Sequence, residues 1–176
     1  MLTSLGADAV PVKRPEELER VDGLVIPGGE SSVMDKLSRM FGLADPLKAA
    51  IADGMPVYGT CAGLIMLADS VLDAIDGQQT LGGFDLVVRR NAFGSQLDSF
   101  ETDLEVPELD GPPMHAVFIR APIVESVGDS ARALASLPDG RVVAVAQGAL
   151  LGTSFHPEMT GDTRFHEHFL RTVARA

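Results

Sequence analysis

Short apolar runs alternate with helix-like periodicity over the first third of the chain. This alternation predicts a largely parallel sheet with helices on both faces. The predicted strands of this part are Ala9–Val12, Gly23–Ile26 and Pro56–Gly59. The predicted helices are one that ends at Met1–Gly6, one capped by Ser31 or Ser32 with Val33, Met34, Leu37 and Met40 on its apolar side, one over Asp45–Asp53 and one over Ala62–Leu67.

The rest of the chain is dominated by strand-like runs separated by Gly, Pro and Asp. They are Phe84–Arg90, Phe100–Val106, Met114–Ile119, Val142–Gln147 and Leu150–Phe155. The last two flank Gly148-Ala149 and predict a hairpin, and Arg164–Arg175 has the periodicity of a closing helix. The pattern therefore predicts a three-layer α/β fold with an open mixed sheet, parallel at its centre with antiparallel additions.

The first predicted element is a helix end, whereas an open α/β sheet of this kind usually begins with a strand. We therefore expect residues 1–176 to be a single domain that is N-terminally truncated, its first strand missing. Without that strand the sheet would have a gap near its centre, where neighbouring strands lose backbone hydrogen bonds.

Charge and composition narrow the classes of partner. The formal net charge is −11, which opposes binding to nucleic acid or to anionic membranes. No apolar run is long enough to cross a bilayer, and no secretory signal is visible. The chain has one cysteine and so cannot form an internal disulfide. We expect a cytoplasmic protein whose thiol is either buried filler or a nucleophile.

The cysteine lies in Gly59-Thr60-Cys61-Ala62-Gly63, where a predicted strand meets a predicted helix. A nucleophile there occupies a sharp turn, and flanking glycines prevent clashes across it. The helix N-terminus favours negative charge on sulfur, and the N–H of Ala62 points to where an oxyanion would form. The alternative is a small buried cysteine between two packing glycines.

A base and its orienting carboxylate are present near the C-terminus, in Phe155-His156-Pro157-Glu158. A thiol nucleophile needs both groups. Residues two apart on an extended segment point the same way, so His156 and Glu158 can be partners. The motif alone also fits a surface histidine beside an acidic residue. Its position after a predicted strand, like that of Cys61, favours a shared ligand site.

Other polar motifs are ambiguous on their own. The loop Pro27–Ser32 follows a strand and exposes N–H groups, yet it also fits an ordinary strand-to-helix turn. Arg90 and Arg120 end predicted strands and suit a substrate carboxylate, although solvated arginines are commoner. His166 and His168 lie two apart on a predicted helix and point away from each other, so we expect no metal site.

Taken together, the motifs resemble those of the class I (triad-type) glutamine amidotransferases, which have a flavodoxin-like fold. The signs are a Gly-x-Cys-x-Gly elbow, an upstream Pro-Gly-Gly loop and a late His-Pro-Glu, in this order. Within that class, the chain resembles the glutaminase subunits of pyridoxal 5'-phosphate synthases over its full length. The segments that carry this closer resemblance are PGGESS at Pro27–Ser32, GTCAG at Gly59–Gly63, RNAFG at Arg90–Gly94, VFIRAP at Val117–Pro122 and FHPEM at Phe155–Met159.

The resemblance implies an enzyme that hydrolyses L-glutamine to glutamate and ammonia. Cys61 would attack the side-chain amide to give a glutamyl thioester, with His156 and Glu158 completing the triad. The residues implied to hold glutamine are Gly29, Glu30, Ser31, Arg90, Ile119 and Arg120, and the oxyanion donors are Gly29 and Ala62. The resemblance also implies that a synthase partner receives the ammonia and that the glutaminase itself binds no cofactor.

Two departures from the family pattern leave alternatives open. The family's first strand and its loop, which resembles LALQG, are absent, and Ser95 stands where the family usually has arginine. A catalytically impaired partner-binding module is therefore one alternative. Another class I cysteine hydrolase, such as a γ-glutamyl hydrolase, is the second, although the RNAFG and VFIRAP segments argue against it.

Overall fold

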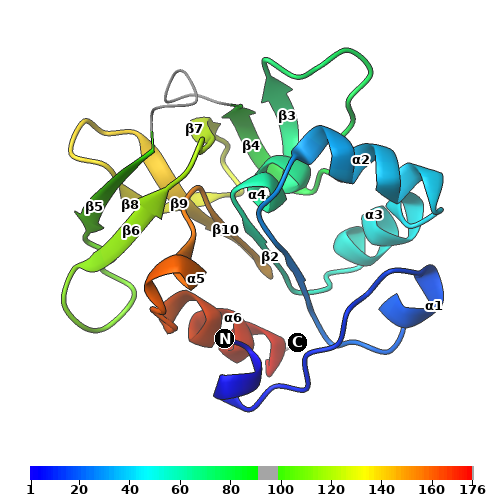
Figure 1. Ribbon diagram of the computed structural model, residues 1–176, viewed down its shortest axis with the longest axis horizontal. Coiled ribbons are helices and arrows are strands. Elements are labelled where there is room, and N and C mark those ends of the chain that lie inside the picture. Colours follow the sequence, from blue (N-terminus) through cyan, green and yellow to red (C-terminus); the bar gives the residue numbers. More distant parts are fainter. Residues whose placement is uncertain (91–98, 176) are drawn as a thin grey trace.

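The computed structural model describes residues 1–90 and 99–175. Within them, eight strands form one mixed sheet in the order β1-β2-β10-β9-β7-β4-β3, with β8 paired to β9, and β5 and β6 form a separate antiparallel pair (Figure 1). The strands are β1 (Leu24–Ile26), β2 (Val57–Thr60), β3 (Ala68–Leu72), β4 (Phe84–Arg89), β5 (Phe100–Leu104), β6 (Met114–Phe118), β7 (Ile123–Val127), β8 (Arg132–Ser136), β9 (Val142–Gln147) and β10 (Leu150–Thr153).

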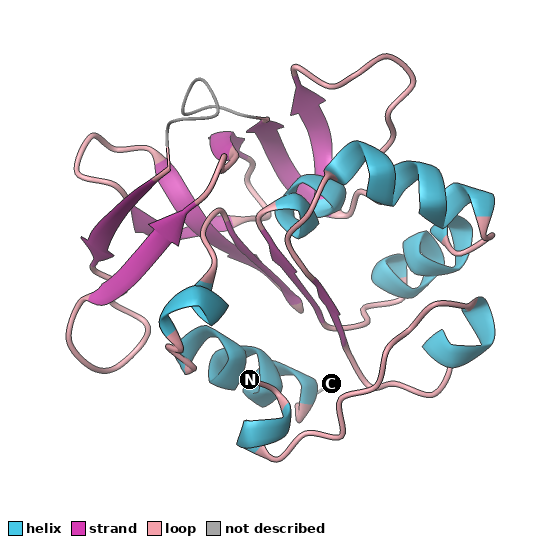
Figure 2. Ribbon diagram, in the orientation of Figure 1, coloured by secondary structure: helices cyan, strands magenta, loops and turns pink. Residues whose placement is uncertain are grey.

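Helices flank the sheet on both faces, as Figure 2 shows by colour. They are α1 (Pro15–Leu18), α2 (Ser31–Met40), α3 (Ala44–Ala52), α4 (Ala62–Leu67), α5 (Pro157–Thr160) and α6 (Arg164–Val173), preceded by a short 3-10 helix at Thr3–Leu5. In the described part of the chain, every helix is too short or too polar to span a bilayer.

Successive side chains of β2 and β10 pack alternately into two hydrophobic cores, one on each face of the sheet. On β2, Val57 enters the core beneath α3 and α4, whereas the next residue, Tyr58, enters the core beneath α6. Leu150 and Leu151 of β10 divide in the same way. This alternation follows from the two-residue repeat of a strand, and it confirms the predicted three-layer α/β architecture.

The strands β1, β2 and β10 run parallel to one another and form one end of the sheet. Ile26 pairs with Gly59, and Gly59 in turn pairs with Gly152. Because the three strands run in the same direction, the loops that follow them leave from one edge of the sheet. The predicted hairpin is confirmed, since β9 and β10 pair antiparallel with Leu150 opposite Gln147.

Two predictions about the N-terminal half are wrong, and a third holds in part. Ala9–Val12 forms no strand, because it has no ladder partner in the described residues. Met1–Gly6 does contain a helix end at left-handed Gly6, but the helix is a short 3-10 helix over Thr3–Leu5. The cap of α2 is Glu30, whose carboxylate accepts the Ser32 N–H, and neither predicted serine has that role.

The apolar stripe predicted to bury α2 lies mostly in solvent. Val33, Leu37 and Met40 are 51%, 44% and 64% exposed. The buried positions of this helix are Ser31 and Asp35, which are polar. Helix periodicity indicates a face, but only the neighbouring elements decide which face is covered. Five elements were not predicted: α1, β3, β7, β8 and α5.

An apolar groove of about 820 Å³ lies beside β1. It is lined mainly by apolar side chains that include Val12, Leu24, Ile26 and Met34. Among the described residues, β1 pairs with β2 alone, so this opening is at the end of the sheet.

Candidate functional site

The loops after β1, β2 and β10 meet at the carboxyl edge of the sheet. They carry residues 27–32, Cys61 and His156, in that order. The main chain ties two of them together, because the Cys61 N–H donates to the Thr153 carbonyl at 2.7 Å. The site therefore occupies the position where open α/β sheets bind ligands.

Cys61 has a strained backbone, with φ 50° and ψ −104° between β2 and α4. The close approach of the two elements requires glycine on either side. A Cβ on Gly59 would lie 2.5 Å from the Gly63 carbonyl carbon, and one on Gly63 would lie 2.0 Å from the Ile26 carbonyl oxygen. The elbow thus presses α4 against both β1 and β2, and it directs the thiol toward the edge of the sheet.

His156 is held in place by its neighbours. Its backbone N–H donates to the Val117 carbonyl of β6 at 3.1 Å, its Nδ1 lies 2.8 Å from Glu158 Oε1, and its ring lines the same pocket as the Cys61 thiol. The ring also packs on Gly28, where a Cβ would lie 2.4 Å from its Cε1. Gly28 therefore makes room for the imidazole, a role that the sequence did not indicate.

These contacts change the protonation of the two partners. The hydrogen bond with Cys61, followed by that with Glu158, raises the pKa of His156 to about 10. Burial would raise the pKa of Glu158, but the hydrogen bond from His156 and further favourable contacts outweigh it, so that pKa lies below its usual value. At neutral pH the site therefore holds an imidazolium between the sulfur and a carboxylate.

A pocket of about 230 Å³ opens over the thiol. Its lining includes two residues of the proposed triad, Cys61 and His156. It also includes every residue implied to hold glutamine, so that the full lining is Gly29, Glu30, Ser31, Cys61, Ile65, Arg90, Ile119, Arg120 and His156. Glu158 stands behind His156, outside the lining. Ala62 is 1% exposed and begins α4, next to the thiol.

Arg90 is engaged by protein groups on the pocket wall. It is 7% exposed, and its guanidinium donates to Glu30 Oε1 at 2.6 Å and to Gln78 Oε1 at 2.5 Å. Gln78 also donates from Nε2 to the Ser31 hydroxyl at 3.0 Å. Sequence reasoning missed Gln78, because nothing in its local pattern distinguishes it from any loop glutamine.

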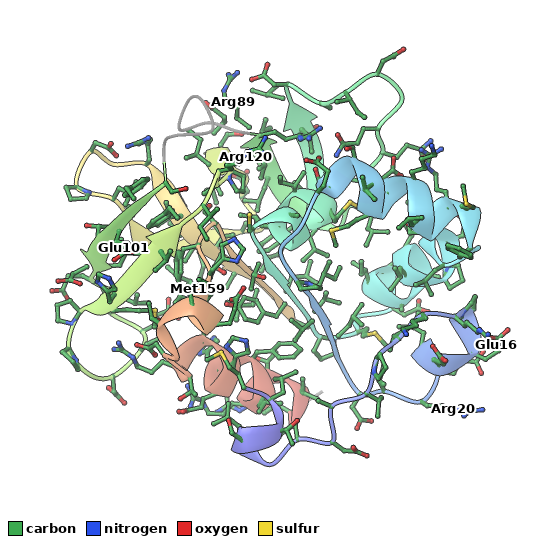
Figure 3. All side chains as sticks on the ribbon, in the orientation of Figure 1. Glu16, Arg20, Arg89, Glu101, Arg120 and Met159 are labelled. Atoms are coloured by element: carbon green, nitrogen blue, oxygen red, sulfur yellow. The ribbon has the colours of Figure 1, made fainter. Side chains whose placement is uncertain are left out.

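Arg120 differs from Arg90 in its surroundings. It stands on the exposed loop between β6 and β7 with φ 48° (Figure 3). Non-glycine residues rarely adopt this left-handed conformation, and they keep it where the surroundings require it. Asn91–Gly94 of the RNAFG segment and Ser95 lie outside the described residues.

The histidine pair of α6 does not form a ligand set. His166 is 6% exposed and packs edge-on against Tyr58, with ring centroids 5.4 Å apart. His168 is half-buried on the same helix. Among residues 1–90 and 99–175, no three His, Cys, Asp or Glu side chains are arranged to hold a metal ion.

Comparison with known proteins adds an independent line of evidence. The sequence model of the SNO glutamine amidotransferase family matches residues 1–175. The chain is 72% identical over 173 residues to the pyridoxal 5'-phosphate synthase subunit PdxT of Leifsonia xyli subsp. xyli, a match that covers 98% of this chain and 87% of that protein. It is 68% identical over 176 residues to the PdxT subunit of Clavibacter sepedonicus, covering 100% of this chain and 84% of the relative.

Solved structures give the same picture. A crystal structure described as a glutamine amidotransferase superposes with a TM-score of 0.90 at 42% identity, over 98% of this chain and 90% of that chain. A crystal structure from Thermoplasma acidophilum, described as part of a GMP synthase, has a TM-score of 0.68 at 19% identity, over 99% and 85% of the two chains, and shows a shared fold only.

Proposed function

This chain belongs to the SNO glutamine amidotransferase family, and we propose that it is the glutaminase subunit of a pyridoxal 5'-phosphate synthase, with Cys61, His156 and Glu158 as its catalytic triad. The observation that carries the triad is the placement of Cys61 and His156 in the lining of one pocket, with His156 Nδ1 2.8 Å from Glu158 Oε1. A nucleophile, a base and an orienting carboxylate in series are the groups that acyl transfer needs.

The first half-reaction forms a thioester. The Cys61 sulfur, as thiolate, attacks the side-chain amide carbon of glutamine, and the carbonyl oxygen becomes an oxyanion. The N–H groups of Gly29 and Ala62 are the proposed donors to that oxyanion. His156 then gives its proton to the amide nitrogen as the carbon–nitrogen bond breaks, so ammonia leaves and the glutamyl group stays on sulfur.

The second half-reaction releases glutamate. His156, now neutral, takes a proton from a water molecule that attacks the thioester carbon. The carbon–sulfur bond breaks, and the imidazolium and thiolate are restored. Glu158 holds the ring in orientation throughout and stabilises its positive charge, without itself moving a proton.

The pocket lining supports a role in binding the rest of the substrate. Glu30, Ser31 and Ile119 line the wall beside the sulfur, and Arg90 and Arg120 supply positive charge. The two N–H groups of an arginine side chain can bind the α-carboxylate of glutamine, and a carboxylate side chain can bind its α-amine. The glutaminase itself needs no cofactor for this chemistry. The ammonia would pass to the synthase partner, and a reduced thiol is consistent with work in the cytoplasm.

The decisive experiment replaces the thiol. We expect Cys61→Ala and Cys61→Ser to abolish glutamine hydrolysis in the complex with the synthase partner while the far-UV spectrum stays unchanged. An electrophilic glutamine analogue should label the parent protein once, at Cys61. Full activity of Cys61→Ala, or a label on another residue, would contradict the triad. A labelled parent that releases no ammonia would favour the impaired binding module.

A further inference from the structure

The side-chain amide of Gln78 bridges two residues of the pocket wall. Its Oε1 accepts from Arg90 Nη1 at 2.5 Å, and its Nε2 donates to the Ser31 hydroxyl at 3.0 Å. Both partners are buried, Arg90 at 7% and Ser31 at 2% exposure. Gln78 is not among the residues that line the pocket. It therefore reaches the pocket only through its two partners.

The loop that carries Gln78 is anchored on both sides. The Gln78 N–H donates to the Ile75 carbonyl at 3.0 Å. The next N–H, that of Gln79, donates to Asp35 Oδ2 at 3.0 Å. Asp35 is 3% exposed on α2 and is itself held by the Arg39 guanidinium at 2.8 and 2.9 Å. These contacts keep the amide of Gln78 in a defined position against the start of α2.

This bridge determines the orientation of Arg90. A guanidinium has five donors in one plane, so two acceptors in that plane fix its rotation. In this structure those acceptors are Glu30, from Nη2 at 2.6 Å, and Gln78, from Nη1. If Gln78 were removed, Glu30 alone would hold the fork, and the Ser31 hydroxyl would lose its amide donor.

We propose that Gln78 is a positioning residue for substrate binding, which orients Arg90 and Ser31 toward glutamine. This inference rests on the glutaminase function proposed above. Because Gln78 touches no reacting atom, its loss should weaken binding of the ground state and the transition state alike, and so change KM far more than kcat.

The test is steady-state glutamine hydrolysis by the complex with the synthase partner. For Gln78→Ala we expect KM to rise about tenfold, the effect of one lost hydrogen bond to a charged group, with kcat within about twofold of the parent. Gln79→Ala is the matched control, because its exposed side chain lies outside the bridge and its N–H bond to Asp35 is kept. Its KM should stay within about twofold of the parent.

A double-mutant cycle separates positioning from general loosening of the loop. In an Arg90→Ala background, Gln78→Ala should raise KM by much less than in the parent, since its main partner is already absent. Additive effects, an unchanged KM in Gln78→Ala, or an equal rise in Gln79→Ala would each overturn the inference. Melting temperatures of all variants exclude unfolding as the cause.

The same measurements distinguish the two proposals. A parent complex that neither hydrolyses nor binds glutamine would overturn the proposed function and this inference with it. A parent complex that hydrolyses glutamine, with Gln78→Ala indistinguishable from it, would overturn this inference alone.

Discussion

At the scale of single residues, the strained backbone of Cys61 and the positive charge on His156 are both features of the proposed catalytic triad. A non-glycine residue with positive φ costs about 1–3 kcal/mol, and such residues cluster at functional sites. Cys61, with φ 50°, is such a residue, and it shares the pocket lining with the imidazole of His156. The neighbouring hydrogen bonds, from Cys61 N–H to Thr153 and from His156 N–H to Val117, hold both groups in place.

The two partners of Cys61 should differ in importance. We expect His156→Asn to lower the rate of glutamine hydrolysis by about 10²–10⁴-fold, because the imidazole transfers protons in both half-reactions. Glu158→Gln should lower it less, since the carboxylate only orients and stabilises the ring. Rates of both variants, measured with the same synthase partner, check the order. The opposite order would mean that the assigned roles are reversed.

Removing the thiol should change the titration of His156. Hydrogen bonding with Cys61 is the largest cause of its raised pKa of about 10, and Glu158 is the next. In Cys61→Ser we expect the pKa of His156 to fall, yet to stay above its ordinary value of about 6.5 because Glu158 remains. NMR titration of the imidazole protons measures the pKa of His156 in the parent protein and in the Cys61→Ser variant. An unchanged pKa would mean that Glu158 alone sets it.

The same shift links stability to pH. Because the folded state raises the pKa of His156, its protonated form stabilises the fold fully below about pH 6.5, and this contribution is lost as the pH rises through about 10. The free energy of unfolding of the parent relative to His156→Asn should therefore decrease between pH 7 and pH 10. Denaturant unfolding at pH 7 and pH 10 measures the free energies of unfolding of both proteins. If the difference between them were the same at the two pH values, the assigned ion pair would be contradicted.

At the scale of elements, the distance between α4 and the sheet depends on two glycines. The Cβ of an alanine at position 63 would lie 2.0 Å from the Ile26 carbonyl oxygen, which belongs to β1 and cannot rotate away. The helix would have to move outward, and its first residue, Ala62, would carry its N–H away from the oxyanion position. The geometry of the site thus depends on the packing of an element whose six residues are all buried.

Gly63→Ala should therefore reduce both stability and activity. We expect a loss of about 3 kcal/mol or more in the free energy of unfolding, as for an overpacked core, together with a large loss of glutamine hydrolysis. Gly140→Ala is the control, because Gly140 has φ 87° and no atom within 4 Å of the added Cβ. That variant should lose only about 1–2 kcal/mol from backbone strain and keep its activity. Similar losses in the two variants would exclude the contact with Ile26 as the cause.

At the scale of the whole molecule, α6 joins the sheet through an aromatic cluster. The ring of Phe165 is fully buried, 5.5 Å from Phe155 and 6.4 Å from Tyr58 between ring centroids. Phe155 directly precedes His156, so the core beneath α6 also supports the loop that carries the base. Phe169 adds a third contact with Tyr58, at 5.9 Å.

Truncation of Phe165 tests this support. We expect Phe165→Ala to lower the free energy of unfolding by about 3–5 kcal/mol, the usual cost of removing a buried aromatic side chain. Met159→Ala, on the neighbouring α5, removes a side chain that is 61% exposed and should change stability by less than about 0.5 kcal/mol. Denaturant unfolding of the two variants gives the comparison. A loss below about 1 kcal/mol for Phe165→Ala would show that α6 contributes little to the sheet.

The sequence by itself determined those features that short segments encode. The elbow at Cys61, the hairpin at Gly148-Ala149 and the helix over Ala62–Leu67 each follow from residue types within a few positions of one another. Apolar runs that end in glycine are sufficient to locate β1 and β2, because burial and turn chemistry act locally. The same local logic placed the thiol and the imidazole after strands, where the structure brings them together.

Only the tertiary structure decided which residues meet across the sheet and which faces are buried. The strand predicted at Ala9–Val12 is absent and the apolar side of α2 is exposed, because pairing and burial depend on neighbours that local periodicity does not specify. Ser31 lies far from Gln78 and Arg90 in the chain, yet the three side chains form one bridge at the pocket wall. Such contacts depend on the order of strands in the sheet, which is set by the packing of the whole chain.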